Sequence, residues 1–187
     1  MQENSKIILG IDPGTNLLGF GVIRVDGKNV SFVDMGVVDM RKEADHFAKL
    51  RKLSLEIEKL FDRYSADCLS IESPFCGKNP QVLLKLGRAQ GVVMSSALRR
   101  GLEVFEYAPR KAKIAITGVG SASKEQVSLM ICRILGVQIK PEHLDATDAL
   151  AIALCHYYQI ISPVSGLKSS SDWKKFLAAN PDRVLKA

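Results

Sequence analysis

The chain has 187 residues, of which 47% are hydrophobic and 25% are charged. This length and balance allow a core large enough for one compact domain, and they exclude the composition of a disordered protein. Lysine and arginine (26) outnumber aspartate and glutamate (20), which gives a formal net charge of +6. The excess favours a polyanionic partner such as nucleic acid, and the plain alternative is a merely basic cytosolic protein.

The start of the chain and its cysteines both indicate the cytoplasm. The first apolar run, residues 7–11, is too short for a signal peptide or a membrane span. Four cysteines are scattered without C-x-x-C spacing: Cys68, Cys76, Cys132 and Cys155. We expect them to be reduced core residues and not disulfides or zinc ligands, so we expect a cytoplasmic protein.

The first third of the chain predicts three antiparallel strands, at residues 6–12, 18–25 and 30–38, which are rich in Ile, Val and Phe. Pro13-Gly14 separates the first pair, and Asp26-Gly27 is a hairpin signal between the second and third. Residues 44–64 then change to helical periodicity, with apolar side chains on one face: Phe47, Leu50, Leu53, Ile57, Leu60 and Tyr64.

The remainder of the chain alternates strand and helix. We expect a strand at 67–72, a helix at 79–100, a short strand at 104–107, and helices at 123–136 and 144–158; Ser123 to Gln126 form a capping box. This order predicts an α/β fold with a five-stranded mixed sheet and helices on both faces. The polar, Ser-rich and basic residues 163–187 predict a flexible tail, with at most a short helix around Trp173.

Four acids stand at the ends of apolar elements, where an unpaired carboxylate is costly: Asp12, Glu72, Asp145 and Asp148. Asp12 and Glu72 each close a predicted strand, at the edge where open α/β sheets place their sites. Asp145 and Asp148 are three residues apart and share one helical face. Oxygen ligands alone suit hard ions such as Mg²⁺ or Mn²⁺, and two such ions can cleave a phosphodiester. The alternative is that each acid is separately a turn residue or a helix N-terminal acid.

Four motifs together resemble the RuvC family of bacterial Holliday junction resolvases. They lie in order between residues 6 and 158: Ile8-Leu9-Gly10-Ile11-Asp12-Pro13-Gly14-Thr15, Ile71-Glu72-Ser73-Pro74-Phe75 with Lys78-Asn79, Leu84-Lys85-Leu86-Gly87-Arg88-Ala89-Gln90-Gly91, and Asp145-Ala146-Thr147-Asp148-Ala149-Leu150-Ala151-Ile152-Ala153.

The resemblance implies an RNase H-like nuclease domain over residues 1–162. It also implies a homodimer, a partnership with the RuvA–RuvB branch-migration complex, and symmetric nicking of two strands at a four-way DNA junction in recombination and repair. The catalytic acids of the family carry over to Asp12, Glu72, Asp145 and Asp148, as ligands of two Mg²⁺ ions per subunit with Mn²⁺ as a substitute.

Other positions are weighed for contact with DNA. Phe75 resembles the family residue that stacks on a base at the junction centre, and the alternative is a loop anchor packed on its own domain. The family uses lysines that match Lys113 and Lys124 near the scissile phosphate. Lys78, Arg110 and Lys111 complete a basic set, although solvated surface charge is an equal interpretation for these three. His46 and His156 carry no functional signal.

The helix from Asn79 has apolar residues at an a/d-like spacing: Val82, Leu86, Ala89 and Val93. Gly87 and Gly91 in the same helix allow close backbone approach. The resemblance makes this helix the dimer interface, and the alternative is ordinary packing on the sheet.

Three other functions are weighed against a junction resolvase. Asp12-Pro13-Gly14-Thr15 also resembles the first phosphate loop of actin-like ATPases and sugar kinases, but two such domains need a much longer chain. An RNase H-like nuclease acting on RNA is a second alternative. A non-catalytic junction-binding protein is a third, against which the four acids argue.

Overall fold

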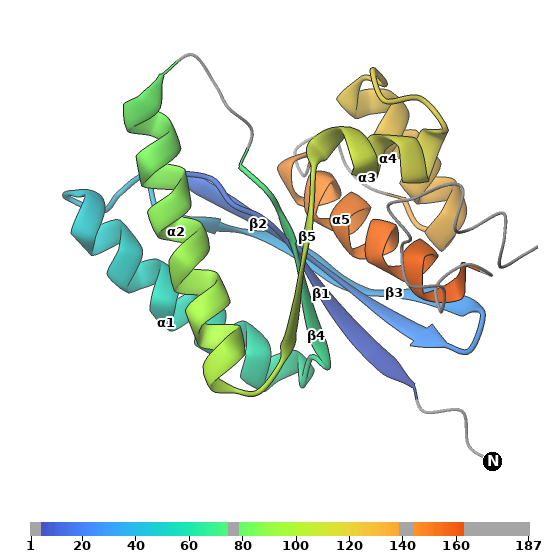
Figure 1. The fold of residues 1–187 in the computed structure, drawn as a ribbon, viewed down its shortest axis with the longest axis horizontal. Helices are drawn as coiled ribbons and strands as arrows, with labels where there is room; N and C mark the ends of the chain where they lie inside the picture. The colour runs from blue at the N-terminus through green and yellow to red at the C-terminus, as the bar shows by residue number, and fades with distance from the viewer. Residues whose placement is uncertain (1–4, 75–78, 139–143, 163–187) are drawn as a thin grey trace, which may run out of the picture.

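The computed structural model describes residues 5–74, 79–138 and 144–162, without the side chains of Leu144 and Asp145. Its centre is one five-stranded sheet in the order β3-β2-β1-β4-β5, with helices on both faces (Figure 1). The predicted fold class is therefore confirmed. The tail predicted from residue 163 lies outside the described residues.

The strands begin and end within one residue of the predicted positions. β1 (Lys6–Asp12), β2 (Leu17–Asp26) and β3 (Asn29–Asp39) form an antiparallel meander. Gly27, with φ of 60°, makes the turn of the predicted hairpin between β2 and β3. β4 (Cys68–Glu72) and β5 (Glu103–Tyr107) extend the sheet on the other side of β1 as parallel strands.

Four helices also match the prediction. α1 (His46–Tyr64) begins at Asp45, and α2 (Pro80–Arg99) begins at Asn79; both side chains accept hydrogen bonds from the first turn of their helix. α4 (Lys124–Leu135) has the predicted capping box and ends at Gly136. α5 (Leu144–Ile161) is the last described element.

α3 (Pro109–Thr117) was not predicted. This helix has only nine residues, and Ala108 at its start makes no side-chain capping hydrogen bond. It therefore lacks the start signal that marks α4. Its remaining signals are Pro109 in the first turn and Gly118 after the last residue, with φ of 76°. The omission matters because α3 carries Arg110, Lys111 and Lys113.

The two faces of the sheet have separate cores. α1 and α2 cover one face, where Leu53 and Val93 belong to the same core as Leu9. α3, α4 and α5 cover the other, where Ile131 and Leu150 belong to the same core as Ile8 (Figure 1). Ile8 and Leu9 enter opposite cores because neighbouring strand residues point to opposite faces.

Glycines in β1 and β2 allow α5 to lie very close to the sheet. A Cβ atom on Gly10 would stand 2.2 Å from the carbonyl oxygen of Ala149, and one on Gly21 would stand 2.7 Å from Cγ of Leu150. Ser70 of β4 also donates a hydrogen bond to the Ile152 carbonyl, at 2.9 Å. These contacts fix the N-terminal half of α5 over the strands whose ends carry the predicted acids.

The predicted stripe on α2 is not one surface. Ala89 and Val93 are buried in the core that α2 shares with α1, whereas Val82 is 45% exposed. Ordinary packing is therefore the correct interpretation for Ala89 and Val93, whereas Val82 lies in the first turn of α2, which remains exposed on this face. Gly87 and Gly91 lie on the outward side, where nothing stands within 4 Å of an added Cβ.

Cys68, Cys132 and Cys155 are free thiols, as predicted, and Cys76 lies outside the described residues. Among the helices described, none combines the length and the apolar character that crossing a membrane would require.

Candidate metal centre

Three of the four predicted acids line one cavity of about 250 Å³: Asp12, Glu72 and Asp148. Asp12 and Glu72 are the last residues of β1 and β4, which are neighbouring parallel strands, so both carboxylates reach the same edge of the sheet. Asp148 comes from α5, which the contact at Gly10 holds against β1. The remaining wall belongs to α3, α4 and α5: Pro109, Ala112, Lys113, Lys124, Val127 and Ala151.

The electrostatics of Glu72 show that these acids interact. Burial, followed by the negative charges of Asp12 and Asp148, raises the pKa of Glu72 from the usual 4.5 to about 8. Lys124 and Lys113 act in the opposite direction. Three carboxylates that repel one another in a half-buried cavity are a donor set that a divalent cation would stabilise.

Both lysines that the family resemblance indicated lie at this cavity. Nζ of Lys124 is 2.6 Å from Oδ2 of Asp148, whose side chain is only 16% exposed. Nζ of Lys113 donates a hydrogen bond to the carbonyl of Ala122, at 2.9 Å, from the loop that leads into α4. Two cations and three acids therefore share one small space.

The described carboxylates share the cavity without forming a finished coordination shell. No group of three His, Cys, Asp or Glu side chains within the described parts of the chain is arranged closely enough to hold a metal ion. Asp145 belongs to the first turn of α5, but its side chain is outside the description. The donor chemistry nevertheless fits a hard ion, because the metal-binding side chains among the described lining residues are carboxylates, without His or Cys.

The other predicted DNA-binding residues have different positions. Arg110 is exposed on α3, and its side chain lies against Gly120. Lys111 is not among the residues that line the cavity. Its Nζ donates to Oε1 of Gln159 at 3.4 Å and lies 5.0 Å from the centre of the Tyr107 ring. Phe75 and Lys78 fall outside the described residues.

Gln90 is a residue near the site that the sequence interpretation missed. It is buried on α2, and its Nε2 donates to Oε1 of Glu106 at 2.5 Å and to the carbonyl of Glu72 at 3.5 Å. It thus ties α2 to the end of β4. The sequence signal that could have identified Gln90 is a polar residue at a buried position of the helix, between Ala89 and Val93.

Comparison with known proteins decides the family. The family model of crossover junction endodeoxyribonuclease RuvC matches residues 8–156. The chain belongs to the RuvC family. It is therefore a crossover junction endodeoxyribonuclease, and nucleases of this family are metal-dependent.

Individual RuvC proteins agree with this assignment. The crossover junction endodeoxyribonuclease RuvC of Bacteroides fragilis is 51% identical over 181 residues, which cover 96% of each chain. The RuvC structure from Thermus thermophilus has a TM-score of 0.72 and 32% identity, covering 82% of this chain and 95% of that one. A second structure shows T. thermophilus RuvC in complex with a Holliday junction substrate, with a TM-score of 0.72, 29% identity, and coverage of 84% and 96%. The kinase and ATPase alternative is thereby excluded.

Proposed function

We propose that this chain resolves four-way DNA junctions by hydrolysing one phosphodiester in each of two symmetric strands, with Asp12, Glu72, Asp145 and Asp148 as the metal ligands. The observation that carries the proposal is the cavity that unites acids from β1, β4 and α5 with Lys113 and Lys124. The T. thermophilus relative, whose bound substrate is a Holliday junction, supports the choice of DNA substrate.

The ligand set suits two Mg²⁺ ions per subunit, with Mn²⁺ as a substitute. When bound, such ions supply an activated water and stabilise the leaving oxygen of an in-line displacement. Asp12 and Glu72 contribute their charge from the rigid ends of two strands. Glu72 must first release its proton, because its pKa of about 8 leaves it largely protonated at neutral pH.

The two lysines hold the substrate phosphate at the acids. Lys124 pairs with Asp148 in the cavity, and a phosphate that enters offers it a second anionic partner. Lys113 comes from the adjacent helix α3. The apolar residues Val127 and Ala151 form part of the wall, which lowers the effective dielectric constant around the charges inside.

The remaining predicted residues contact the DNA around the cut. Phe75 and Lys78 follow Glu72 by three and six residues, which brings a ring for base stacking and a cation close to the acids along the chain. Arg110 is exposed on α3, one residue after Pro109 of the cavity wall. With Lys111, it contributes positive charge for the phosphate backbone.

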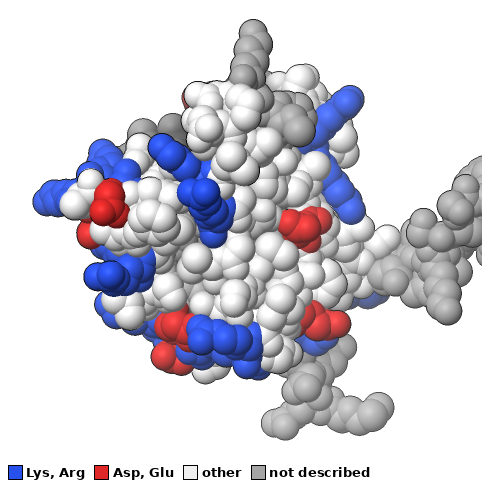
Figure 2. All heavy atoms as spheres, turned by 60° about the vertical axis from the view of Figure 1, so that its left-hand side comes forward, with Lys and Arg blue, Asp and Glu red and all other residues white. Residues whose placement is uncertain are grey.

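Two symmetric cuts require two active sites related by a two-fold axis, so we include a homodimer in the proposal. The outward side of α2 supports it: Leu84 is 56% exposed, and Gly87 and Gly91 have open space above them. Figure 2 shows a broad area without charged side chains on the side of the molecule where α1 and α2 lie. The enzyme would work on DNA in the bacterial cytoplasm, with the RuvA–RuvB complex as its partner.

A cleavage assay on three substrates tests the proposed function. A four-way junction, a linear DNA duplex and an RNA duplex of matched sequence are incubated with the protein and Mg²⁺. Paired symmetric nicks in the junction, with neither duplex cut at a comparable rate, are the expected result. Equal cutting of the linear duplex would contradict junction selectivity, and preferential cutting of RNA would restore the RNA nuclease alternative.

A further inference from the structure

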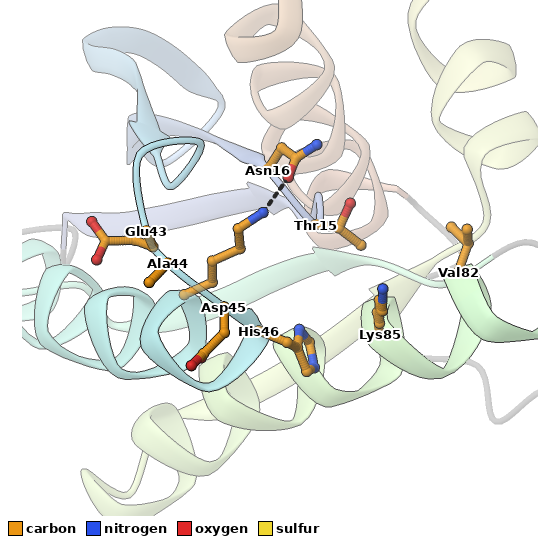
Figure 3. A pocket seen from close by; sticks show the side chains of 9 residues that line it. Thr15, Asn16, Glu43, Ala44, Asp45, His46, Val82 and Lys85 are labelled. Atoms are coloured by element: carbon orange, nitrogen blue, oxygen red, sulfur yellow. Dashed lines mark hydrogen bonds between the residues drawn. The ribbon is translucent and has the colours of Figure 1, made fainter.

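A second cavity, of about 260 Å³, lies beside the turn that follows Asp12 and shares no residue with the metal centre. Three segments that are distant in sequence meet there: the β1–β2 turn, the start of α1 and the start of α2 (Figure 3). The residues that line it are Thr15, Asn16, Glu43, Ala44, Asp45, His46, Lys49, Val82 and Lys85.

Two lysines and two acids line the cavity, so its effect on an anion depends on which of these side chains face the open space. Nζ of Lys49 donates to Oδ1 of Asn16 at 2.6 Å, which is a neutral partner. Lys85 is exposed and forms no ion pair with any residue that the structure describes. Figure 3 shows its amine directed towards Thr15, across the cavity from Asn16.

The two acids in the wall are already engaged elsewhere. Glu43 accepts from Nζ of Lys52 at 3.0 Å, and Asp45 accepts from the backbone N–H of Ala48 at 2.8 Å as the cap of α1. Their carboxylates point away from Thr15 and Lys85 in Figure 3. An anion placed between Thr15 and Lys85 would therefore meet two lysines and no competing carboxylate.

Polar groups complete the wall. The hydroxyl of Thr15 and the amide of Asn16 come from the turn, and Nε2 of His46 is buried without a hydrogen-bond partner among the described residues. A buried polar atom without a partner is unusual in a folded protein and suits a wall that a polar ligand completes. The volume lies below the roughly 300–1,000 Å³ of a typical small-molecule site, which favours a single charged group of a larger ligand.

The position relative to the metal centre identifies that larger ligand. Thr15 and Asn16 follow Asp12 by three and four residues in the same β1–β2 turn. This short separation along the chain makes the DNA strand whose scissile phosphate would lie at Asp12 the ligand that we consider for the cavity.

We propose that this cavity binds a non-scissile backbone phosphate of the junction DNA, held by Lys49 and Lys85 with Thr15 and Asn16. The proposal rests on the proposed function, because it takes the strand at Asp12 as its reference. The contact positions the strand and carries no sequence information, since it reads a phosphate and no base edge.

The first test is the salt dependence of junction binding. Lys85→Ala removes one phosphate contact, so the log-log slope of affinity against salt should become shallower by about one. Between about 50 and 200 mM salt, wild type should thus lose about threefold more affinity than the variant. Lys85→Arg should keep the wild-type slope. Lys59→Ala is the matched control, because Lys59 is an exposed lysine of α1 that pairs with Glu56. Light scattering checks that every variant keeps the wild-type mass.

The second test locates the phosphate. Junctions carry one neutral methylphosphonate at a time in the strand around the cut. One position, a few nucleotides from the cut, should weaken binding by wild type and by Lys59→Ala, but not by Lys85→Ala. Equal losses with all three proteins at every position, or an unchanged salt slope, would overturn the proposal.

The outcomes separate this cavity from the metal centre. Wild type that neither binds nor cuts junctions contradicts the proposed function itself. If wild type cuts junctions but Lys85→Ala binds them with the wild-type salt slope, only the phosphate site is contradicted. Titration with inorganic phosphate at constant ionic strength distinguishes a site for free phosphate from a site for DNA, and the NMR signals of the His46 ring report the binding. Saturation by phosphate without any methylphosphonate effect would overturn the assignment to DNA.

Discussion

Lys124 and Asp148 form an ion pair of 2.6 Å inside the cavity that also contains Asp12 and Glu72. The lysine side chain is 51% exposed and the aspartate 16%, so the cation reaches from the mouth of the cavity towards a more buried acid. An ion pair in this position stabilises an acid cluster that would otherwise be dominated by repulsion. A divalent cation that binds the same acids competes with the lysine for Asp148.

The first prediction follows from this competition. Lys124→Met should lower the thermal stability of the protein in EDTA at about pH 9, where Glu72 is ionised, because the acids lose a counter-charge. Mg²⁺ should then raise the melting temperature of the variant more than that of wild type. Lys59→Met, on the exposed surface of α1, is the control. An equal or smaller Mg²⁺ effect in Lys124→Met would show that the lysine does not compete with the metal.

Asp12→Asn should abolish cleavage and leave junction binding in place. The substitution keeps the shape of the side chain but removes a ligand charge, so the cleavage rate in Mg²⁺ should fall below about 1% of wild type. The same variant should be more stable than wild type in EDTA, because one of three repelling carboxylates is gone. Asp62→Asn is the control, at an aspartate of α1 that is 69% exposed. Near wild-type nicking by Asp12→Asn would remove Asp12 from the metal centre.

The raised pKa of Glu72 predicts a pH dependence with a definite sign. Because its pKa is about 8 in the folded protein and 4.5 when unperturbed, the folded state binds the proton more tightly than the unfolded state does. In EDTA, this group should therefore reduce stability as pH rises from about 4.5 to 8, by at most about 1.4 kcal/mol per pH unit. Urea unfolding measures the slope, and Glu72→Gln should lack it.

The metal should reverse this trend. Binding requires ionised Glu72 and releases its proton, so the Mg²⁺ affinity of wild type should increase up to about pH 8 and level off above it. Calorimetric titration in two buffers of different ionisation enthalpy measures the released proton. Affinity that does not change between pH 6 and about 8 would mean that Glu72 is already ionised or is no ligand.

Local signals account for what the sequence could predict. The strands and four helices followed from apolar periods, the Asp26-Gly27 turn and the Ser123 capping box, each of which depends on a few adjacent residues. Asp12 and Glu72 were predicted for a similar reason, since an acid after an apolar strand is a local anomaly. α3 was missed because Ala108 offers no side-chain cap.

Contacts between distant segments explain the remainder. The Lys124–Asp148 pair depends on how closely α5 approaches β1, which Gly10 decides through a contact with Ala149. The role of Gln90 could be predicted only if the buried face of α2 were known. The a/d spacing suggested a dimer interface for Ala89, which is buried within its own subunit. The cavity that we propose for a backbone phosphate assembles from three segments, of which none has a motif of its own, so His46 carried no signal in the sequence.

The last prediction concerns the outward side of α2. A Cβ atom added at Gly91 would have no neighbour within 4 Å in the folded chain, so the side chain of Gly91→Gln starts in open space on its own subunit. The substitution should even stabilise the single subunit, by up to about 1 kcal/mol, because glycine is a poor helix residue. If two copies pack α2 against α2, however, the added side chain stands between the helices and should yield monomers. Light scattering measures the mass, and urea unfolding checks that the monomer is folded. Monomers should nick junctions singly, without the paired cuts that require two sites on one axis. An unchanged dimer mass would place the interface on another surface.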